Sequence, residues 1–212
     1  MLRQLDLLST GAPSFDTTFA DRERLELAQG AWIDRVPGWV RGHDALFDEL
    51  ERDLPWRHET MKMYDKIVDV PRLLAQVPSE GAGQPLIEGM RQALSHHYGE
   101  TFVYVSAALY RGGSDSVAMH GDTTARNMLS SLVATVSLGA PRGFVMRPTE
   151  GGASRTLSLG HGDLVVMGGS FQRTWRHGIP KVASAGPRIA LMFRPAWARD
   201  YRSSADSRSR RR

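Results

Sequence analysis

Two segments of the N-terminal half carry apolar residues at the three- and four-residue spacing of an amphipathic helix. The first set is Leu46, Phe47, Leu50 and Leu54. The second set is Leu86, Ile87, Met90, Leu94 and Tyr98. Asp44 precedes the first set as an N-cap candidate, and Pro85 precedes the second, where a proline suits the first helical turn. The pattern predicts two helices, each with one buried face.

The segment between these two helices, residues 54–78, has no clear period. Pro55, Pro71 and Pro78 interrupt it, and it is richer in aromatic and basic residues than either helix. We therefore expect an irregular connection here.

From about residue 100 the chain changes to short apolar runs of β type, separated by glycine or proline. The runs are 102–110, 129–138, 143–147, 155–159, 163–167, 171–177 and 188–193. Closely spaced strands with turn residues between them are typical of a sandwich or barrel. We therefore expect a mainly β protein with flanking helices. An N-terminal α/β extension of residues 1–100 would lead into a β core of residues 101–198 within a single domain.

The composition restricts the chemistry. The 212 residues include no cysteine, which excludes a disulfide, a zinc–thiolate site, an iron–sulfur cluster and a cysteine nucleophile. Any metal must therefore be bound by His, Asp or Glu. No apolar run approaches the ~18 residues of a membrane span, and Asp6 interrupts the start before a signal-peptide core can form. We expect a soluble, cytoplasmic monomer with no membrane partner.

The formal net charge of +4 is confined to the C-terminal end. Residues 199–212 contain six arginines and two aspartates, so residues 1–198 are formally neutral. This Ser/Arg tail has almost no apolar residue to bury, and we expect it to be disordered. It is either a solvated terminus or a source of non-specific affinity for phosphates.

The tripeptide His-Gly-Asp occurs twice, at residues 120–122 and 161–163. Residues i and i+2 of a strand point to the same face, so the His and the Asp of one copy can both reach one ion. The second copy is flanked by glycine and followed at once by a strand, which predicts a tight turn. The first copy precedes a polar stretch, residues 123–127, which leaves room for a pocket. His120 and Asp122 are therefore the metal candidates.

His177 is available as a third ligand, 55 residues beyond Asp122, at the end of a predicted strand. Two histidines and one carboxylate form a facial set suited to iron(II), with three coordination positions left open. The alternative for His177 is an ordinary core or surface histidine.

The last predicted strand alternates two kinds of residue. Ile189, Leu191 and Phe193 share one face, and Arg188, Ala190, Met192 and Arg194 share the other. Three large apolar residues on one face indicate a central strand, so an arginine on the other face points into the barrel. A buried guanidinium needs an anion, and a carboxylate fits it best because both groups can pair through two hydrogen bonds.

These stretches together resemble the AlkB family of iron(II)- and 2-oxoglutarate-dependent dioxygenases. The resemblance covers residues 39–195 and rests on residues 63–73, 109–122, 136–142, 159–169, 175–181 and 188–194. It implies a double-stranded β-helix, or jelly roll, whose iron is bound by His120, Asp122 and His177. It also implies 2-oxoglutarate and O2 as cosubstrates.

The resemblance also implies roles for residues that the patterns alone do not assign. Arg188 would pair with the distal carboxylate of 2-oxoglutarate, while Tyr110 and Arg194 assist at the cosubstrate. Residues 1–100 would supply support and a nucleotide-recognition lid. Thr124 stands where better-known members carry an acidic residue that recognises the methylated base.

The activity that the resemblance implies is oxidative demethylation of N-alkylated nucleic-acid bases, which releases formaldehyde, succinate and CO2. The expected substrate is alkylated DNA, with RNA left open. A base within a duplex must be flipped out to reach the metal, and the expected contacts are Tyr64, Arg72 and Thr124. Lys62 and Lys66 would meet phosphates, and Trp56 either stacks on a base or packs in the core.

Two other functions stay open from the sequence. One is the same oxygenase chemistry on transfer RNA, a protein side chain or a small metabolite. The other is a β-helix binding module without catalytic activity, whose metal site is vestigial or structural.

Overall fold

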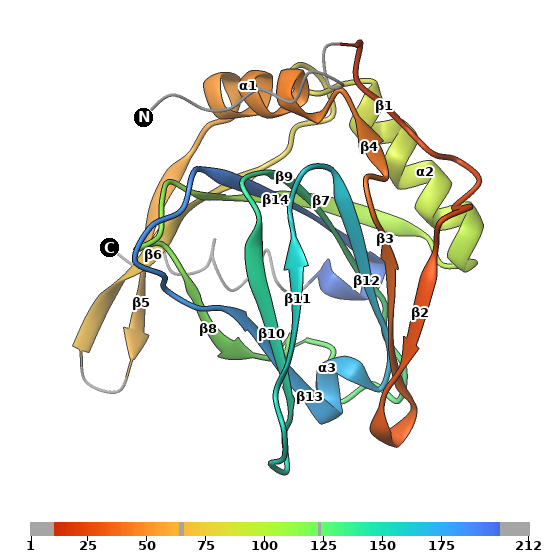
Figure 1. Ribbon diagram of the computed structural model, residues 1–212, viewed down its shortest axis with the longest axis vertical. Helices are drawn as coiled ribbons and strands as arrows, with labels where there is room; N and C mark the ends of the chain where they lie inside the picture. Colours follow the sequence, from red (N-terminus) through yellow and green to blue (C-terminus); the bar gives the residue numbers. More distant parts are fainter. Residues whose placement is uncertain (1–10, 64–65, 123, 200–212) are drawn as a thin grey trace.

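β-Strands are the commonest regular element of the described residues, and they form one long sheet, one shorter sheet and a two-stranded pair of β1 and β4 (Figure 1). The computed structural model describes residues 11–63, 66–122 and 124–199. The N-terminal strands are β1 (Ser14–Phe15), β2 (Glu23–Glu26), β3 (Ala31–Val36) and β4 (Val40–Arg41), with the 3-10 turn η1 (Ala28–Gly30) before β3. A hairpin follows, made of β5 (Arg57–Met63) and β6 (Lys66–Gln76). The helices are α1 (His43–Asp53), α2 (Leu86–Tyr98) and the short α3 (Phe171–Thr174).

The remaining strands form the rest of the two sheets. They are β7 (Phe102–Tyr110), β8 (Val117–His120), β9 (Val133–Gly139), β10 (Arg142–Pro148), β11 (Arg155–Leu159), β12 (Asp163–Gly169), β13 (Trp175–Ile179) and β14 (Arg188–Pro195), followed by η2 (Ala196–Arg199). The long sheet has the order β2-β3-β12-β9-β14-β7-β6-β5, and the shorter one has the order β11-β10-β13-β8. The mainly β prediction, with a jelly-roll core and few helices, is confirmed.

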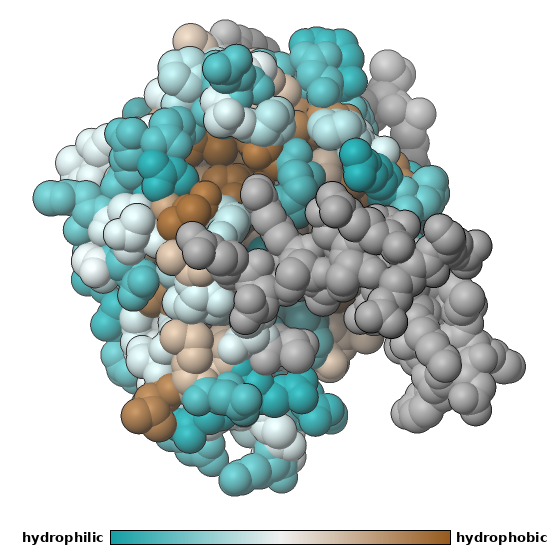
Figure 2. Space-filling view, turned by 180° about the vertical axis from the view of Figure 1, so that it is seen from behind, coloured by the Kyte–Doolittle hydropathy of each residue, from teal (hydrophilic) through white to brown (hydrophobic). Residues whose placement is uncertain are grey.

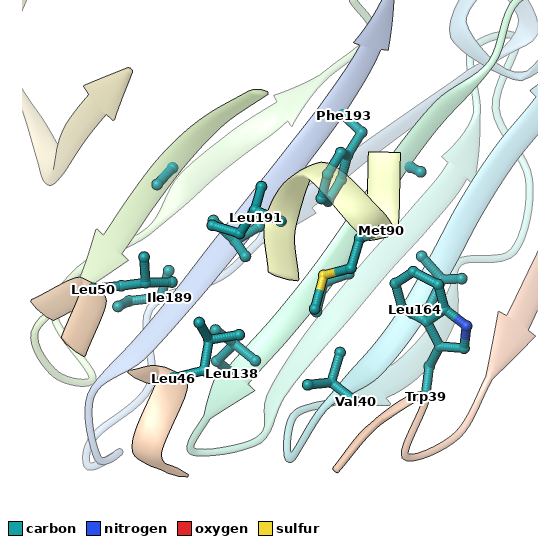
Figure 3. Close-up of a cluster of buried hydrophobic side chains, with 14 of the residues drawn as sticks. Trp39, Val40, Leu46, Leu50, Met90, Leu138, Leu164, Ile189, Leu191 and Phe193 are labelled. Atoms are coloured by element: carbon teal, nitrogen blue, oxygen red, sulfur yellow. The ribbon is translucent and has the colours of Figure 1, made fainter. Parts of the chain in front are cut away.

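The outer face of the long sheet is covered by α1 and α2, and a first apolar cluster fills the space between (Figure 3). Leu46 and Leu50 of α1 and Met90 of α2 meet Leu138, Ile189 and Leu191 of the sheet there. Each of these side chains is at most 1% exposed, and full burial of one such side chain stabilises a fold by about 1.5–3 kcal/mol. The helical periods therefore predicted the buried faces correctly.

A second apolar cluster lies between the two sheets. The shorter sheet contributes Phe144, Met146 and Trp175, and the long sheet contributes Tyr110 and Ala190. β14 lies between β7 and β9, with its odd-numbered residues in the first cluster and its even-numbered residues toward the second. The predicted central position and the predicted two faces of this strand are thus confirmed.

The helix starts differ slightly from the prediction. Gly42, in the left-handed conformation at φ 61°, caps α1, and Asp44 lies inside its first turn. Asp44 is therefore not the cap, although its negative charge near the N-terminus still interacts favourably with the positive end of the helix dipole. Pro85 is the N-cap of α2 rather than a member of its first turn.

The expectation of an irregular segment at 54–78 was wrong, because β5 and β6 form an antiparallel hairpin there. The register shifts between His58 and Thr60, opposite the stretch of β6 that contains Pro71. A proline lacks the N–H that a ladder needs, but it is tolerated at such a bulge. The carbonyl oxygen of Pro71 accepts a hydrogen bond from the Ser116 N–H at 2.8 Å, just before β8.

Two of the expected strands also have different bounds. Residues 171–174 form helix α3 and not a strand. Phe171 and Trp175 are both buried, and their spacing of four residues suits a helical turn. Residues 129–132 precede β9, which begins at Val133. The apolar runs at 102–110 and 155–159 match β7 and β11.

The surface seen from behind is mostly polar, with small separated apolar areas where the described residues are in view (Figure 2). Within the described ranges, no helix is both long and apolar enough to cross a membrane. The Ser/Arg tail was predicted for residues 199–212, and residues 200–212 lie outside the described part of the chain.

Candidate functional site

The two predicted histidine ligands lie side by side on neighbouring antiparallel strands. His177 of β13 is the register partner of His120 of β8, and their ring centroids are 4.4 Å apart. His177 is only 9% exposed, whereas His120 ends β8 on the solvent-accessible side. The strand pairing therefore brings together two residues that are 57 positions apart in the sequence.

Both imidazoles are neutral at neutral pH. Burial lowers the pKa of His120. Burial lowers the pKa of His177 well below its usual value, and the neighbouring His120 ring and the Arg194 charge lower it further. Nδ1 of His120 lies 2.9 Å from the Ala118 carbonyl oxygen, so we assign the proton to that nitrogen and a free lone pair to Nε2. A neutral imidazole in this tautomer can bind a metal.

Two hydrogen bonds hold the carboxylate of Asp122, and a third holds its main chain. Its Oδ2 accepts a hydrogen bond from Arg194 Nε at 3.0 Å, and its Oδ1 accepts one from the Thr124 N–H at 3.1 Å. The main-chain N–H of Asp122 donates to Gln172 Oε1 at 2.8 Å. Gly121 must be small, because a Cβ there would lie 2.5 Å from the Gln172 carbonyl oxygen.

The residues present fit a divalent ion such as iron(II), because two neutral imidazoles and one carboxylate are its preferred donors. Nδ1 of His177 is buried and has no hydrogen-bond partner within the described residues. An unsatisfied buried nitrogen is expected where a bound group that the chain does not supply takes part in the site. No group of three or more His, Asp and Glu side chains in the described ranges is already arranged as a complete metal site. The assignment of His120, Asp122 and His177 as ligands therefore stays a prediction.

Arg188 is a fully buried cation that pairs with no carboxylate among the described residues. It is 2% exposed, and its Nη2 donates to Ser137 Oγ at 2.7 Å. Its Nε and Nη1 are buried without a partner in the described part of the chain. The guanidinium lies 5.1 Å from the ring of Tyr110, which is the register partner of Arg188 on β7. Because a buried charge is costly when unpaired, this position calls for an anionic ligand.

Arg194 lies six residues further along β14, on the same face as Arg188. Besides Asp122, it contacts Ser106 Oγ through Nη1 at 3.2 Å. One arginine of the strand therefore faces the metal candidates, and the other lies buried beside Tyr110. Tyr110 itself is 3% exposed. The three residues predicted for the cosubstrate thus lie on the adjacent strands β7 and β14.

The residues predicted to contact the substrate are placed unequally. Arg72 of β6 is half-buried, donates from Nη1 to the Ser116 carbonyl oxygen at 3.2 Å, and its charge lowers the pKa of His120. Thr124 is half-buried beside Asp122. Tyr64 lies outside the described residues. The indole N–H of Trp56 donates to the Glu51 carbonyl oxygen at 3.0 Å, and the ring packs against the first core cluster. The core interpretation of Trp56 is therefore the one that the structure supports.

The second His-Gly-Asp copy forms the predicted tight turn. His161 has φ 50°, and the Asp163 N–H donates to the Gly160 carbonyl oxygen at 3.0 Å. The carboxylate of Asp163 accepts a hydrogen bond from the Gly38 N–H at 2.9 Å. A Cβ at Gly162 would lie 2.1 Å from the Val40 carbonyl oxygen, so this position needs glycine.

Two buried polar residues near the site were not singled out from the sequence. Ser137 is fully buried and provides the acceptor for Arg188. Arg142 of β10 is 3% exposed, with its guanidinium 5.8 Å from the Tyr110 ring. The two-residue spacing of Arg142, Phe144 and Met146 along β10 could have indicated that Arg142 points inward, because the three side chains share one face of the strand. Nothing in the spacing distinguishes Ser137 from other strand serines.

Comparisons with known proteins agree with this arrangement. Residues 84–194 match the model of the 2OG-Fe(II) oxygenase superfamily. The chain is 31% identical to "Alpha-ketoglutarate-dependent dioxygenase alkB homolog 3" of Bos taurus, over 78% of this chain and 67% of that protein. It is 29% identical to "DNA oxidative demethylase ALKBH2" of Arabidopsis thaliana, over 88% of this chain and 71% of that protein. The chain thus spans about two thirds of the length of these curated relatives.

Solved structures share the fold at low sequence identity. A 2OG-Fe(II) oxygenase family oxidoreductase from Burkholderia pseudomallei is 17% identical, with a TM-score of 0.53 over 76% of this chain and 84% of that one. OsALKBH1 is 14% identical, with a TM-score of 0.55 over 82% of this chain and all of that one. The matches identify an oxidoreductase that uses iron(II), 2-oxoglutarate and O2, and the chain belongs to the AlkB family of the 2OG-Fe(II) oxygenase superfamily.

Proposed function

We propose that this protein oxidatively demethylates N-alkylated bases of nucleic acid, with alkylated DNA as its main substrate. The single observation that carries the oxygenase chemistry is Arg188, a buried guanidinium whose Nε and Nη1 have no partner within the described residues. A dicarboxylate such as 2-oxoglutarate fits there, because one carboxylate can pair with Arg188 while the 2-oxo acid end reaches the histidine pair. The relatives named as alkB homologues supply the substrate class.

Each residue of the site has a role in this proposal. His120, His177 and Asp122 would hold iron(II), and Arg194 would orient the Asp122 carboxylate through its hydrogen bond. Arg188 would bind the distal carboxylate of 2-oxoglutarate beside the ring of Tyr110. Bound iron(II), 2-oxoglutarate and O2 together supply the oxidation of an N-methyl group, which leaves as formaldehyde while 2-oxoglutarate becomes succinate and CO2. The chain itself binds and orients the reactants and excludes water.

The substrate would approach from the side on which His120 is accessible. Arg72 lies near His120, since its charge lowers the pKa of that histidine in addition to burial, and it would meet a phosphate or the base. Thr124, next to Asp122, would contact the flipped base with a neutral hydroxyl rather than a carboxylate. We also propose that Tyr64 contacts the base, and that the protein acts as a cytoplasmic monomer.

Formaldehyde release tests the proposal. Oligonucleotides that carry 1-methyladenine or 3-methylcytosine, as single-stranded DNA, duplex DNA or RNA, are incubated with the protein, iron(II) and 2-oxoglutarate. We expect formaldehyde and succinate in equal amounts, with more product from DNA than from RNA. Arg147, exposed on β10, offers a matched control, because Arg147→Met should retain succinate formation that Arg188→Met loses.

The outcomes separate the open alternatives. Succinate without formaldehyde from any oligonucleotide would contradict the nucleic-acid substrate and favour another substrate for the same chemistry. Absence of both products from the wild-type protein would favour a binding module. His120→Ala should abolish succinate formation if the histidine pair holds the metal.

A further inference from the structure

Arg142 is a second buried cation beside the ring of Tyr110. The guanidinium of Arg142 lies 5.8 Å from this ring and that of Arg188 lies 5.1 Å from it. Arg142 is 3% exposed, although arginine is among the residues least often buried. A chain retains such a residue only where its contacts or its charge outweigh the desolvation cost.

The hydrogen bonds of Arg142 all go to main-chain carbonyl oxygens. Nη1 donates to Gly112 at 3.0 Å, and Nη2 donates to Asp115 at 2.9 Å and to Pro180 at 2.7 Å. Gly112 and Asp115 lie in the loop between Tyr110 of β7 and the start of β8. Pro180 follows β13. One side chain therefore joins the loop after Tyr110 to the segment after His177.

This loop is tightly held by its own contacts as well. The carboxylate of Asp115 accepts hydrogen bonds from the Arg111 N–H and from Arg111 Nε, each at 2.8 Å. The Val182 N–H donates to the Gly113 carbonyl oxygen at 2.9 Å, and a Cβ at Gly113 would lie 2.4 Å from the Val182 carbonyl oxygen. The loop, β10 and the segment after β13 thus form one packed unit around Arg142.

Within the described ranges, Arg142 forms no ion pair with a carboxylate. Its hydrogen-bond acceptors are carbonyl oxygens, and the nearby acid, Asp115, is paired with Arg111. Arg188 has no acid either, and the charge of Arg142 disfavours the protonated form of Arg188. Two like charges beside one ring repel each other unless a negative ligand lies near both. A ligand with two carboxylates meets this condition better than one with a single carboxylate.

We propose that Arg142 is a positioning residue that selects a dicarboxylate cosubstrate, by holding the Gly112–Asp115 loop in place and by adding a second positive charge beside Arg188. The inference rests on the proposed role of Arg188, because it places the distal carboxylate in the field of both arginines. Arg142 does not need to touch the ligand. Its contribution should therefore depend on the charge of the ligand.

Calorimetric titration of the full chain with Mn(II) in place of iron(II) tests this without turnover. The probes are 2-oxoglutarate and 2-oxopentanoate, which has the same chain length but no distal carboxylate. For Arg142→Met we expect the Kd of 2-oxoglutarate to rise about tenfold and that of 2-oxopentanoate to change less than about twofold, because only the former loses an electrostatic partner. Arg142→Lys retains the charge, so it should restore most of the preference for 2-oxoglutarate.

The control is Arg147→Met, an exposed arginine of the same strand, which should leave both Kd values unchanged. Equal weakening of both ligands by Arg142→Met would overturn the proposal and leave a purely structural role, and so would no change in either. If Arg142→Met does not fold, Arg142→Gln, which can still donate to the carbonyls, makes the same comparison.

Arg188→Met separates failure of this inference from failure of the proposed function. It should lose 2-oxoglutarate binding and retain that of 2-oxopentanoate. Wild-type affinity of Arg188→Met for 2-oxoglutarate would contradict the role of Arg188 itself. Loss of binding in Arg188→Met with unchanged binding in Arg142→Met would contradict only the role of Arg142.

Discussion

Two of the buried charged centres in the molecule, at Asp34 and at Arg188, are satisfied in opposite ways. Asp34 of β3, which is fully buried, accepts hydrogen bonds from Arg24 Nε at 2.7 Å, Arg24 Nη2 at 2.9 Å, Arg22 at 3.2 Å and the Tyr98 hydroxyl at 3.0 Å. The guanidinium of Arg188 of β14 donates to Ser137, while its Nε and Nη1 have no partner among the described residues. A buried charge that serves the fold is fully paired by the chain itself. Because these two donors of Arg188 are unused in the described part of the chain, its charge is suited to pair with a ligand.

Replacing Arg188 should have the largest effect, and on activity rather than on folding. In Arg188→Met we expect 2-oxoglutarate-dependent succinate formation to fall by about 100-fold or more, because the partner of a buried carboxylate is lost. Unfolding in the absence of 2-oxoglutarate should occur at an equal or higher temperature, since an unpaired buried charge is removed. Thermal denaturation with and without 2-oxoglutarate measures both. A large loss of stability without ligand would show that Arg188 supports the fold.

Replacing Asp34 should have the opposite effect, with a loss of stability and no loss of activity. In Asp34→Asn we expect the free energy of unfolding to fall by about 3 kcal/mol, because Arg22 and Arg24 lose their buried partner. Succinate formation per folded molecule should stay at the wild-type level. Urea denaturation combined with the activity assay measures the two quantities. Loss of activity in a stable Asp34→Asn protein would contradict the separation of the two centres.

The stability difference between the wild type and Asp34→Asn should also depend on pH. Burial raises the pKa of Asp34, but the hydrogen bond and charge of Arg24, with Tyr98 and Arg22, lower it more, so that the pKa lies below its usual value. The ionised form therefore stabilises the folded state above the unfolded pKa of about 3.9, and this stability is lost as the pH falls through the lower, folded pKa. The stability difference between wild type and Asp34→Asn should be constant near pH 7 and shrink below about pH 4. A difference that does not vary with pH would contradict the pairing.

Ser137→Ala should have a smaller effect on the unpaired centre. It removes the one hydrogen bond that orients the guanidinium of Arg188. A hydrogen bond to a charged group contributes about 1.5 kcal/mol, so we expect the Kd of 2-oxoglutarate to rise about tenfold. Calorimetric titration in the presence of Mn(II) measures it. An unchanged Kd would show that packing against Tyr110 alone orients Arg188.

The smallest effect is expected for Tyr98→Phe. This change removes one of the hydrogen bonds to Asp34 and leaves both arginines in place. The free energy of unfolding should fall by about 1 kcal/mol, with cosubstrate affinity unchanged. A loss above about 3 kcal/mol would mean that Tyr98 is needed to assemble the whole network.

The sequence predicted those parts of the fold that depend on local spacing. The runs of β7 and β11, the two faces of β14 and the buried faces of α1 and α2 all follow from period and turn residues. The β5–β6 hairpin did not follow, because Pro71 reads as a break unless the bulge opposite it is known. Residues 171–174 were taken as strand because Phe171 and Trp175 fit either period.

Site residues that belong to one short motif could be predicted from the sequence. Contacts between residues far apart in the sequence were harder to predict. The first and second His-Gly-Asp copies differed in their flanking residues, and the structure separates them in the same way. Asp34 and its partner Tyr98 are 64 residues apart, and Arg142 contacts a carbonyl 38 residues away. No local pattern encodes such pairs, because strand pairing alone brings them together.

The position of β14 in the long sheet has a consequence for the way the chain folds. This strand, the last of the sheet in sequence, lies between β9 and β7. Without it, the sheet is divided into β2-β3-β12-β9 and β7-β6-β5, and each part exposes an edge of largely buried residues. Unpaired apolar edges are prone to pair with other chains. A chain still being synthesised is therefore most prone to aggregation until β14 is inserted, and the same step buries Arg188 and completes the cosubstrate site.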